Sequence, residues 1–151
     1  TTNENGFYFF ENLPVDSSYT ITATANTREV TRSERIEGIN VTDLVILARH
    51  LSPDGPSLDN LAAYIAGDIN QDQSISLIDL VFIQQYILLG EDSLGAGNPL
   101  WRFYVNGSEF NPNDGFPSPD TSYQLDGISE SRDDLDFVGV KGGDVNGSGN
   151  Q

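Results

Sequence analysis

A loop-and-helix unit occurs twice in this chain of 151 residues, at an offset of 36 residues. Residues 38–47 align with residues 74–83, and Asp43 and Asp79 are among the four identities between the two copies. After the first copy apolar residues recur at the i, i+3, i+4 and i+7 spacing of one helix face, and the helix of the second copy is apolar at Leu80, Val81, Ile83, Ile87 and Leu88. The middle of the chain is therefore expected to contain two equivalent loops, each followed by an amphipathic helix.

Oxygen-bearing side chains stand at alternate positions before the second helix. Asp68, Asn70 and Asp72 occupy positions 1, 3 and 5 of a twelve-residue loop, and Asp79 occupies position 12. In this EF-hand-like spacing the alternating side chains point at one cation, and the carbonyl of Ser74 adds a further ligand. Hard oxygen ligands in this number favour Ca²⁺ over softer metals. We predict calcium as the cofactor and these five residues as its ligands.

The loop also departs from the EF-hand pattern. Gln73 fills position 6, where the EF-hand has glycine, and position 12 holds aspartate in place of a bidentate glutamate, so a reduced affinity is expected. The alternative interpretation is an acidic turn in which Asp79 is a helix-start residue favoured by the helix dipole.

The first copy of the unit lacks the ligand half of its loop. The positions that would be 1, 3 and 5 before Asp43 hold Arg32, Glu34 and Ile36, which cannot form the shell. The end of the chain, residues 144–150, reads Asp-Val-Asn-Gly-Ser-Gly-Asn, a half loop with no helix after it. We predict a second, split calcium site, within one chain or between neighbours; the alternative is a flexible glycine-rich tail. Its ligands are Asp43, Asp144, Asn146, Ser148 and the carbonyl of Asn150.

The charge of the chain narrows the range of partners. Seven Lys and Arg against 23 Asp and Glu give a formal net charge of −16, which repels nucleic acid and anionic lipid surfaces. No apolar stretch approaches the length of a membrane span, so we expect neither nucleic-acid binding nor membrane insertion. Divalent cations suit such a chain, because they relieve repulsion among the carboxylates.

The chain contains few of the residues that usually act as catalytic nucleophiles or bases. The chain has no cysteine, and its one histidine, His50, stands inside an apolar helical pattern where a packed side chain is expected. A nucleophilic triad therefore has no obvious members. Carboxylate pairs of the kind used in glycoside hydrolysis occur by chance in so acidic a chain. We do not expect an enzyme and name no catalytic residue.

Strands are predicted on either side of the helical region. Gly6–Phe10 and Tyr19–Thr24 flank turn residues and predict a hairpin, and Arg28–Arg35 is a candidate edge strand. Two or three strands cannot bury themselves, so later strands must complete the sheet. These later candidates are Trp101–Val105, Tyr123–Leu125 and Phe137–Val140, in a segment rich in Gly, Pro, Asn, Asp and Ser.

The expected fold class is α+β, with an antiparallel β-sandwich-like sheet and a three-helix calcium-binding insert. Helices are predicted over residues 42–51, 58–66 and 77–89, with Ser57 capping the second. The predicted organisation is incomplete sandwich strands in 1–35, the helical calcium-binding region in 36–90, and a loop-rich segment that completes the sheet in 91–151.

The continuous loop resembles a known family. Residues 67–81, which read GDINQDQSISLIDLV, with Ile87 and Gly90 after them, resemble a type I dockerin repeat, an F-hand calcium loop and helix of secreted bacterial proteins. That family normally has aspartate at position 12, as here. Residues 5–14 resemble the last part of a carboxypeptidase regulatory-like, prealbumin-like β-sandwich. The order of these parts, ending in residues 136–148, resembles a repeat of large secreted bacterial surface proteins.

The resemblance implies an extracellular or cell-surface structural role. We expect a calcium-stabilised module that forms fibres or filaments with copies of itself, either as tandem repeats or head-to-tail subunits joined by strand donation. The alternative is a carbohydrate- or protein-binding adhesion module, in which Trp101 and Tyr104 stack on sugar rings.

Two further expectations concern other partners and modification. Dockerins grip cohesin through small hydroxyl residues after the ligand loop, but Leu77 and Ile78 stand there, so we expect burial against the chain's own sheet and no cohesin docking. Asn40 and Asn106 begin N-glycosylation patterns, as does Asn146, and Ser93 lies in a short bacterial O-glycosylation motif.

Overall fold

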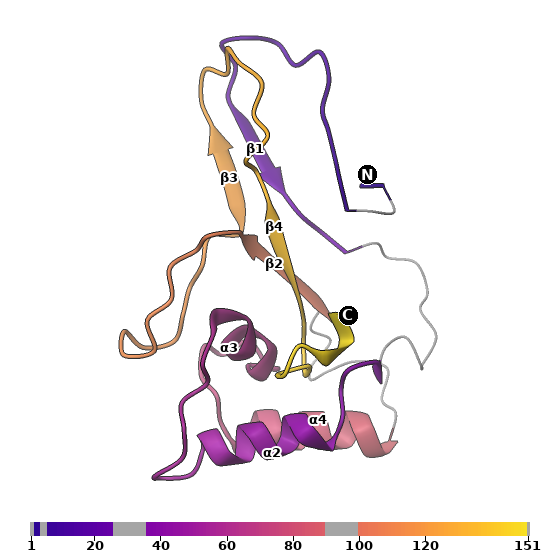
Figure 1. The fold of residues 1–151 in the computed structure, drawn as a ribbon, viewed down its shortest axis with the longest axis vertical. Helices are drawn as coiled ribbons and strands as arrows, with labels where there is room; N and C mark the ends of the chain where they lie inside the picture. Colours follow the sequence, from indigo (N-terminus) through magenta and orange to yellow (C-terminus); the bar gives the residue numbers. More distant parts are fainter. Residues whose placement is uncertain (1, 4–5, 26–35, 90–99, 151) are drawn as a thin grey trace.

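The structure, a computed structural model, describes residues 2–3, 6–25, 36–89 and 100–150. It is a mixed α+β fold, in which helices occupy one end of the molecule and strands the other (Figure 1). The elements, in chain order, are β1 (Tyr19–Thr22), α2 (Val41–His50), α3 (Leu61–Gly67), α4 (Leu77–Leu89), β2 (Trp101–Val105), β3 (Ser122–Leu125), β4 (Phe137–Lys141) and the 3-10 turn η1 (Ser148–Asn150).

The described strands form two antiparallel pairs. β1 pairs with β3, and β2 pairs with β4. Tyr19 stands opposite Leu125 in the first pair, and Trp101 stands opposite Lys141 in the second. The strands predicted late in the chain are therefore confirmed. One of them, β3, pairs with the first strand, whereas β2 and β4 form a separate sheet and not a single completed one.

The predicted N-terminal hairpin is wrong. Residues 6–10 belong to no strand, and β1 finds its partner about a hundred residues later in β3. The aromatic side chains of this segment are largely exposed, so a local hairpin gains little from burying them, whereas β3 contributes the buried Leu125. Tyr8 contacts the later chain through its hydroxyl, which donates to the carbonyl of Leu135. The edge strand predicted at 28–35 lies outside the described residues.

α2 and α3 begin at asparagine caps. Asn40 Oδ1 accepts from Thr42 N at 2.8 Å, and α2 starts at the next residue after Asn40, one position before the prediction. Asn60 Oδ1 accepts from Ala63 N at 2.8 Å, so the cap of α3 lies three residues after the predicted Ser57 cap. α4 spans the predicted residues. Among the described residues, no helix has the length and apolar character needed to cross a membrane.

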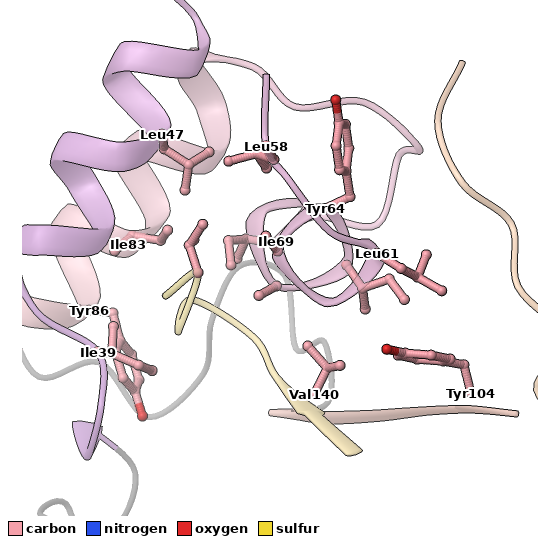
Figure 2. Close-up of a cluster of buried hydrophobic side chains, with 14 residues drawn as sticks. Ile39, Leu47, Leu58, Leu61, Tyr64, Ile69, Ile83, Tyr86, Tyr104 and Val140 are labelled. Carbon is pink, nitrogen blue, oxygen red and sulfur yellow. The ribbon is translucent and has the colours of Figure 1, made fainter. Parts of the chain in front are cut away.

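The hydrophobic core lies between the helices and the β2–β4 pair (Figure 2). Leu47 of α2 and Ile83 of α4 are fully buried where the two helices pack together. Tyr104 of β2 and Val140 of β4 close the core from the sheet side. One core therefore joins the predicted 36–90 and 91–151 segments and fixes β4, and the chain end after it, against the helices.

Candidate metal centre

The continuous loop connects α3 to α4. Asp68 is the C-cap residue of α3, and Asp79 lies in the first turn of α4. Gln71 and Gln73, at loop positions 4 and 6, have φ values of +59° and +64°. Gln73 therefore takes the left-handed backbone that glycine usually supplies at position 6, at a cost of about 1 kcal/mol. At position 6 the loop therefore differs from the EF-hand in having glutamine in place of glycine, but its backbone makes the same turn.

The first and last carboxylates of the continuous loop are oriented by backbone amides. Asp68 Oδ1 accepts from Asp72 N and its Oδ2 accepts from Gln73 N, both at 3.1 Å. Asp79 Oδ1 accepts from Ile69 N and its Oδ2 accepts from Ser76 N, both at 2.8 Å. These bonds orient the oxygens, and each oxygen of Asp68 keeps a second lone pair for a cation. Asp79 Oδ2 accepts a second bond, from Ser76 Oγ at 3.1 Å, which a cation there would replace.

The middle ligands form a chain of short turns. Asn70 Oδ1 accepts from Asp72 N at 3.2 Å, and Asp72 Oδ1 accepts from Ser74 N at 3.0 Å. The hydroxyl of Ser74 and the side-chain amide of Asn70 also donate to Asp72, and these bonds lower the pKa of its carboxyl. Asp72 is therefore held as the ionised form that a metal ligand needs.

The structure brings the two halves of the split loop together within one chain. Asp43 lies in the first turn of α2, and Asp144 follows β4; both side chains are buried. Asn146 N donates to Asp43 Oδ1 at 3.1 Å, across 103 residues of sequence. The predicted juxtaposition of Asp43 with the chain end is therefore observed. No side-chain placement is described for Asn150.

Position 1 is equivalent in the two loops. Ser148 N and Gly149 N, at positions 5 and 6, each donate to a different oxygen of Asp144 at 2.9 Å. The amides at positions 5 and 6 of the continuous loop bind Asp68 in the same way, at 3.1 Å. Gly147 at position 4 has φ +68°, close to the +59° of Gln71.

Position 12 is equivalent as well. Asp43 Oδ2 accepts from Asn40 N at 2.8 Å, as Asp79 Oδ2 accepts from Ser76 N at 2.8 Å. The other oxygen of each carboxylate accepts from the amide at position 3, although in the continuous loop this contact is long at 3.4 Å. The split loop thus reproduces the continuous loop from residues far apart in sequence.

A glycine precedes each loop, and the two loops lie side by side. Gly143 N donates to Ala66 O at 2.8 Å, which joins the chain segments that lead into them. A Cβ on Gly67 would lie 3.1 Å from Ile75 Cδ1, and a Cβ on Gly143 would lie 3.3 Å from Ile39 Cδ1. The isoleucines stand at position 8 of their loops, so the same packing is repeated in both.

Burial sets the electrostatics of the two loops. The position 1 and position 12 carboxylates are at most 4% exposed; they are Asp43, Asp68, Asp79 and Asp144. Burial raises the pKa of Asp43 and of Asp68, and in Asp43 the charge of Asp144 adds to the rise. Buried carboxylates without a cation are costly, so a bound cation fits this arrangement.

Two basic side chains of the β2–β4 pair lie near the loops. Arg102 interacts electrostatically with Asp68 and Asp79, burial lowers its pKa, and its buried Nε has no hydrogen-bond partner among the described residues. Lys141, whose pKa burial also lowers, interacts with Asp144. The sequence did not predict that Arg102 and Lys141 lie near the loops. The one available signal was that the acidic chain has only seven basic residues, of which Arg102 stands in a predicted strand and Lys141 directly after one.

The ligand chemistry of each loop is mixed. Across the described residues, no group of three or more His, Cys, Asp or Glu side chains is close enough to hold a metal ion. The continuous loop has two buried carboxylates, the exposed carboxylate of Asp72, an amide oxygen and a main-chain oxygen. The split loop has two buried carboxylates with amide, hydroxyl and main-chain oxygens. Such neutral oxygens are ordinary ligands for Ca²⁺ and poor ligands for softer metals, so the donor set fits calcium.

The residues after the continuous loop's ligands are exposed. Leu77 is 72% exposed and Ile78 is 54% exposed, so their predicted burial against the sheet is wrong. α4 turns Asp79, Ile83 and Tyr86 inward, which leaves these positions on its outer side. Val41, Val45 and Val81 are further exposed apolar side chains on α2 and α4. The absence of cohesin docking stays a prediction, without the reason first given for it.

The sugar-stacking candidates lie in the sheet. Tyr104 is buried in the core, which accounts for its ring by packing. Trp101 is half-buried, and Lys141 Nζ lies 5.9 Å from its ring centre. His50, as expected, packs edge-on against Tyr64, with ring centres 5.5 Å apart. None of these positions forms an open aromatic platform.

The glycosylation candidates differ in their surroundings. Asn106 is exposed in the turn that follows β2, where a glycan can be accommodated. The side chain of Asn40 is engaged on both sides, because its Oδ1 caps α2 and its Nδ2 donates to Gly38 O at 2.9 Å. Modification there would remove the cap. Ser93 lies outside the described residues.

Comparison with known proteins finds no match: no family model, curated protein or solved structure is similar to this chain. The likeness of residues 67–81 to a type I dockerin repeat is therefore a prediction that the comparisons leave untested. The geometry of the two loops is the basis for assigning a function.

Proposed function

We propose that this chain is a calcium-stabilised structural module that binds two calcium ions, one in the continuous loop and one in the split loop. The observation that carries the proposal is the repeated pattern of backbone hydrogen bonds on Asp68 and Asp79, and on Asp144 and Asp43. An acidic turn alone gives no reason for a distant chain end to rebuild the same pattern around Asp43.

The ligands follow from loop positions 1, 3, 5, 7 and 12. In the continuous loop they are Asp68, Asn70, Asp72, the carbonyl of Ser74, and Asp79. In the split loop they are Asp144, Asn146, Ser148, the carbonyl of Asn150, and Asp43. Arg102 and Lys141 offset part of the buried negative charge, and calcium supplies the rest. The continuous loop, with three carboxylates against two, is the stronger site.

The proposed setting is outside the cell, as part of a secreted bacterial protein. Extracellular calcium modules bind with dissociation constants of roughly 10⁻⁴ to 10⁻³ M, which suits loops with aspartate at position 12. The α+β arrangement is compatible with a dockerin-like helical insert in an unfinished β-sandwich-like sheet. We propose no enzyme activity.

The proposed structural role is a fibre or filament built from copies of this chain, either tandem or head-to-tail. Support comes from the two-stranded β1–β3 sheet, since a pair of strands leaves backbone groups open at its edges. The adjacent N-terminal segment is not part of a strand and exposes Phe7, Phe9 and Phe10. A strand donated by a neighbour is one way to complete such a sheet.

A protein-binding adhesion module is the second candidate. The observation that favours it is the number of exposed large apolar side chains on α2 and α4, because apolar side chains that gather on a surface mark contact sites. Leu77→Ser with Ile78→Ser would weaken such binding and leave calcium affinity unchanged.

Titration calorimetry with calcium tests the metal sites. We expect two ions per chain for the wild type, and one for Asp43→Ala and for Asp79→Ala. The matched control is Asp126→Ala, which removes an exposed acid in the segment between β3 and β4. Two ions bound by Asp43→Ala would eliminate the split site. Sedimentation velocity with millimolar calcium and with EDTA tests self-association, and a monomer in both conditions would remove the separate-subunit fibre.

A further inference from the structure

The chain segments that enter and leave the helical unit are in direct contact. Ser148 Oγ donates to Gly38 O at 3.1 Å, and Lys141 Nζ donates to Glu37 O at 2.7 Å. A Cβ on Gly38 would lie 2.5 Å from Gly149 N, and a Cβ on Gly149 would lie 2.8 Å from Glu37 O. No side chain fits between the two backbones, so they touch through main-chain atoms.

We call the contact between residues 37–43 and 141–149 the closing contact. Figure 1 shows the C-terminal turn beside the segment that leads into α2. Within the contact, Asn146 N reaches Asp43 Oδ1 at 3.1 Å. Roughly 100 residues lie between the two sides, which are nonetheless neighbours in space. They include α3, α4, β2 and β3, and most of α2 and β4.

This arrangement determines where tension travels along the chain. A force that enters at Glu37 and leaves at Gly149 crosses the closing contact and reaches the core only if the contact opens. We propose that the closing contact is a mechanical bypass locked by calcium, and that it protects the helical core from tension applied across its two sides, at Glu37 and Gly149. The inference rests on the proposed calcium site in the split loop and specifies what that ion does.

Calcium locks the bypass because its ligands come from both sides of the contact. Asp43 lies on one side, and Asp144, Asn146 and Ser148 lie on the other. Hydrogen bonds at the contact can exchange with water one at a time, whereas an ion held from both sides must lose a charged ligand before the sides separate. Removing calcium therefore weakens the contact without unfolding the core directly.

Single-molecule pulling across the contact tests the bypass. The chain has no cysteine, so Glu37→Cys and Gln151→Cys place handles at two unique points. At constant force, we expect the closed state to live at least about tenfold longer in millimolar calcium than in EDTA. Opening of the contact should precede unfolding of the core, and complete unfolding of the roughly 110 residues between the handles should bring the total gain to about 370 Å of contour length.

A pair of glycine substitutions separates disruption of the contact from backbone strain alone. Gly38 and Gly107 have φ values of +81° and +83°, so alanine introduces comparable backbone strain at both. A Cβ at Gly38 lies 2.5 Å from Gly149 N and 2.8 Å from Asp144 Oδ2, whereas a Cβ at Gly107, outside the contact, meets nothing within 4 Å. We expect Gly38→Ala to lose the calcium-dependent lifetime and Gly107→Ala to keep it.

The calcium stoichiometry, measured on the same proteins, separates the possible failures. If the wild type does not bind calcium in the split loop, the proposed function fails and the bypass fails with it. If two ions bind but the lifetime is the same in calcium and EDTA, or if extension begins within the core, the bypass alone is refuted. If Gly38→Ala does not fold, the lifetimes of the wild-type closed state in calcium and in EDTA still test the bypass.

Discussion

Replacing Asp43 with alanine removes the one residue that the split loop takes from the helical region. Its side chain is fully buried and accepts from Asn40 N at 2.8 Å and from Asn146 N at 3.1 Å. The substitution therefore breaks the α2 capping box and the bond to the chain end, and it removes the position 12 ligand. These effects separate when stability is measured with and without calcium.

Without calcium, the expected loss is small. Losing the capping interaction costs about 1 kcal/mol, and losing the partner of the Asn146 amide costs about 1 kcal/mol more. Burial raises the pKa of Asp43, so removing its charge offsets part of this loss. With calcium at a hundred times its dissociation constant, each bound ion adds about 2.7 kcal/mol. Asp43→Ala should then reduce the calcium-dependent stabilisation from about 5.4 to about 2.7 kcal/mol.

Urea unfolding followed by the fluorescence of Trp101, the only tryptophan, measures both quantities. In thermal melts the lost calcium-dependent part corresponds to a Tm decrease of roughly 5–11 °C. Asp126→Ala, which removes the same charge from an exposed position, should retain the full calcium effect. If Asp43→Ala responds to calcium as strongly as the wild type, the split loop does not bind the ion.

Three other changes test the loop backbone, the core and the buried acids. Gln73→Gly should raise the free energy of unfolding by up to about 1 kcal/mol, because glycine relieves the positive φ; a decrease in a urea titration would contradict this. Leu47→Ala should cost about 2–5 kcal/mol, and Val45→Ala, on the exposed side of α2, less than about 0.5; equal costs would contradict the packing. Because burial raises the pKa of Asp43 and Asp68, these two carboxyls bind more protons in the calcium-free folded chain than in the unfolded chain above about pH 4. Relative to Asp43→Ala, the wild type should therefore lose stability as the pH rises towards 7 in calcium-free buffer, and a relative gain would contradict the assigned burial.

The sequence predicted the elements whose signals are local. Apolar periodicity located α2 and α4, and the alternating oxygens located the continuous loop. The sequence also predicted that Asp43 lies beside the chain end. Asp43 lacked the ligands at loop positions 1, 3 and 5, and residues 144–150 supplied them but lacked a position 12 aspartate. The partner of β1 was missed, since strand pairing depends on which distant strand buries more surface, and a nearby aromatic run favoured the wrong answer.

Two errors concern which side of a helix faces the core. Leu77 and Ile78 were expected to be buried because they are apolar, yet the inward positions of this turn are taken by Asp79 and then Ile83. Hydrophobicity alone could not distinguish these faces, since α4 is apolar nearly all round. Arg102 and Lys141 were missed because their role depends on β2 and β4 packing beside the loops, which no local pattern encodes.

The two loops should contribute unequally to stability, although their geometry is alike. The ligands of the continuous loop lie within twelve residues, so the unfolded chain keeps part of its affinity for calcium, and that part does not favour folding. The ligands of the split loop come together only when the fold joins residues 103 apart, so its whole binding energy favours the folded state. In a chain without cysteine, this ion takes the place of a long-range cross-link. At saturating calcium, Asp43→Ala should therefore remove a larger share of the calcium-dependent unfolding free energy than Asp79→Ala, even where the continuous loop binds more tightly in calorimetry. A larger share for Asp79→Ala would mean that the continuous loop organises the fold and that the chain end is docked by protein contacts alone.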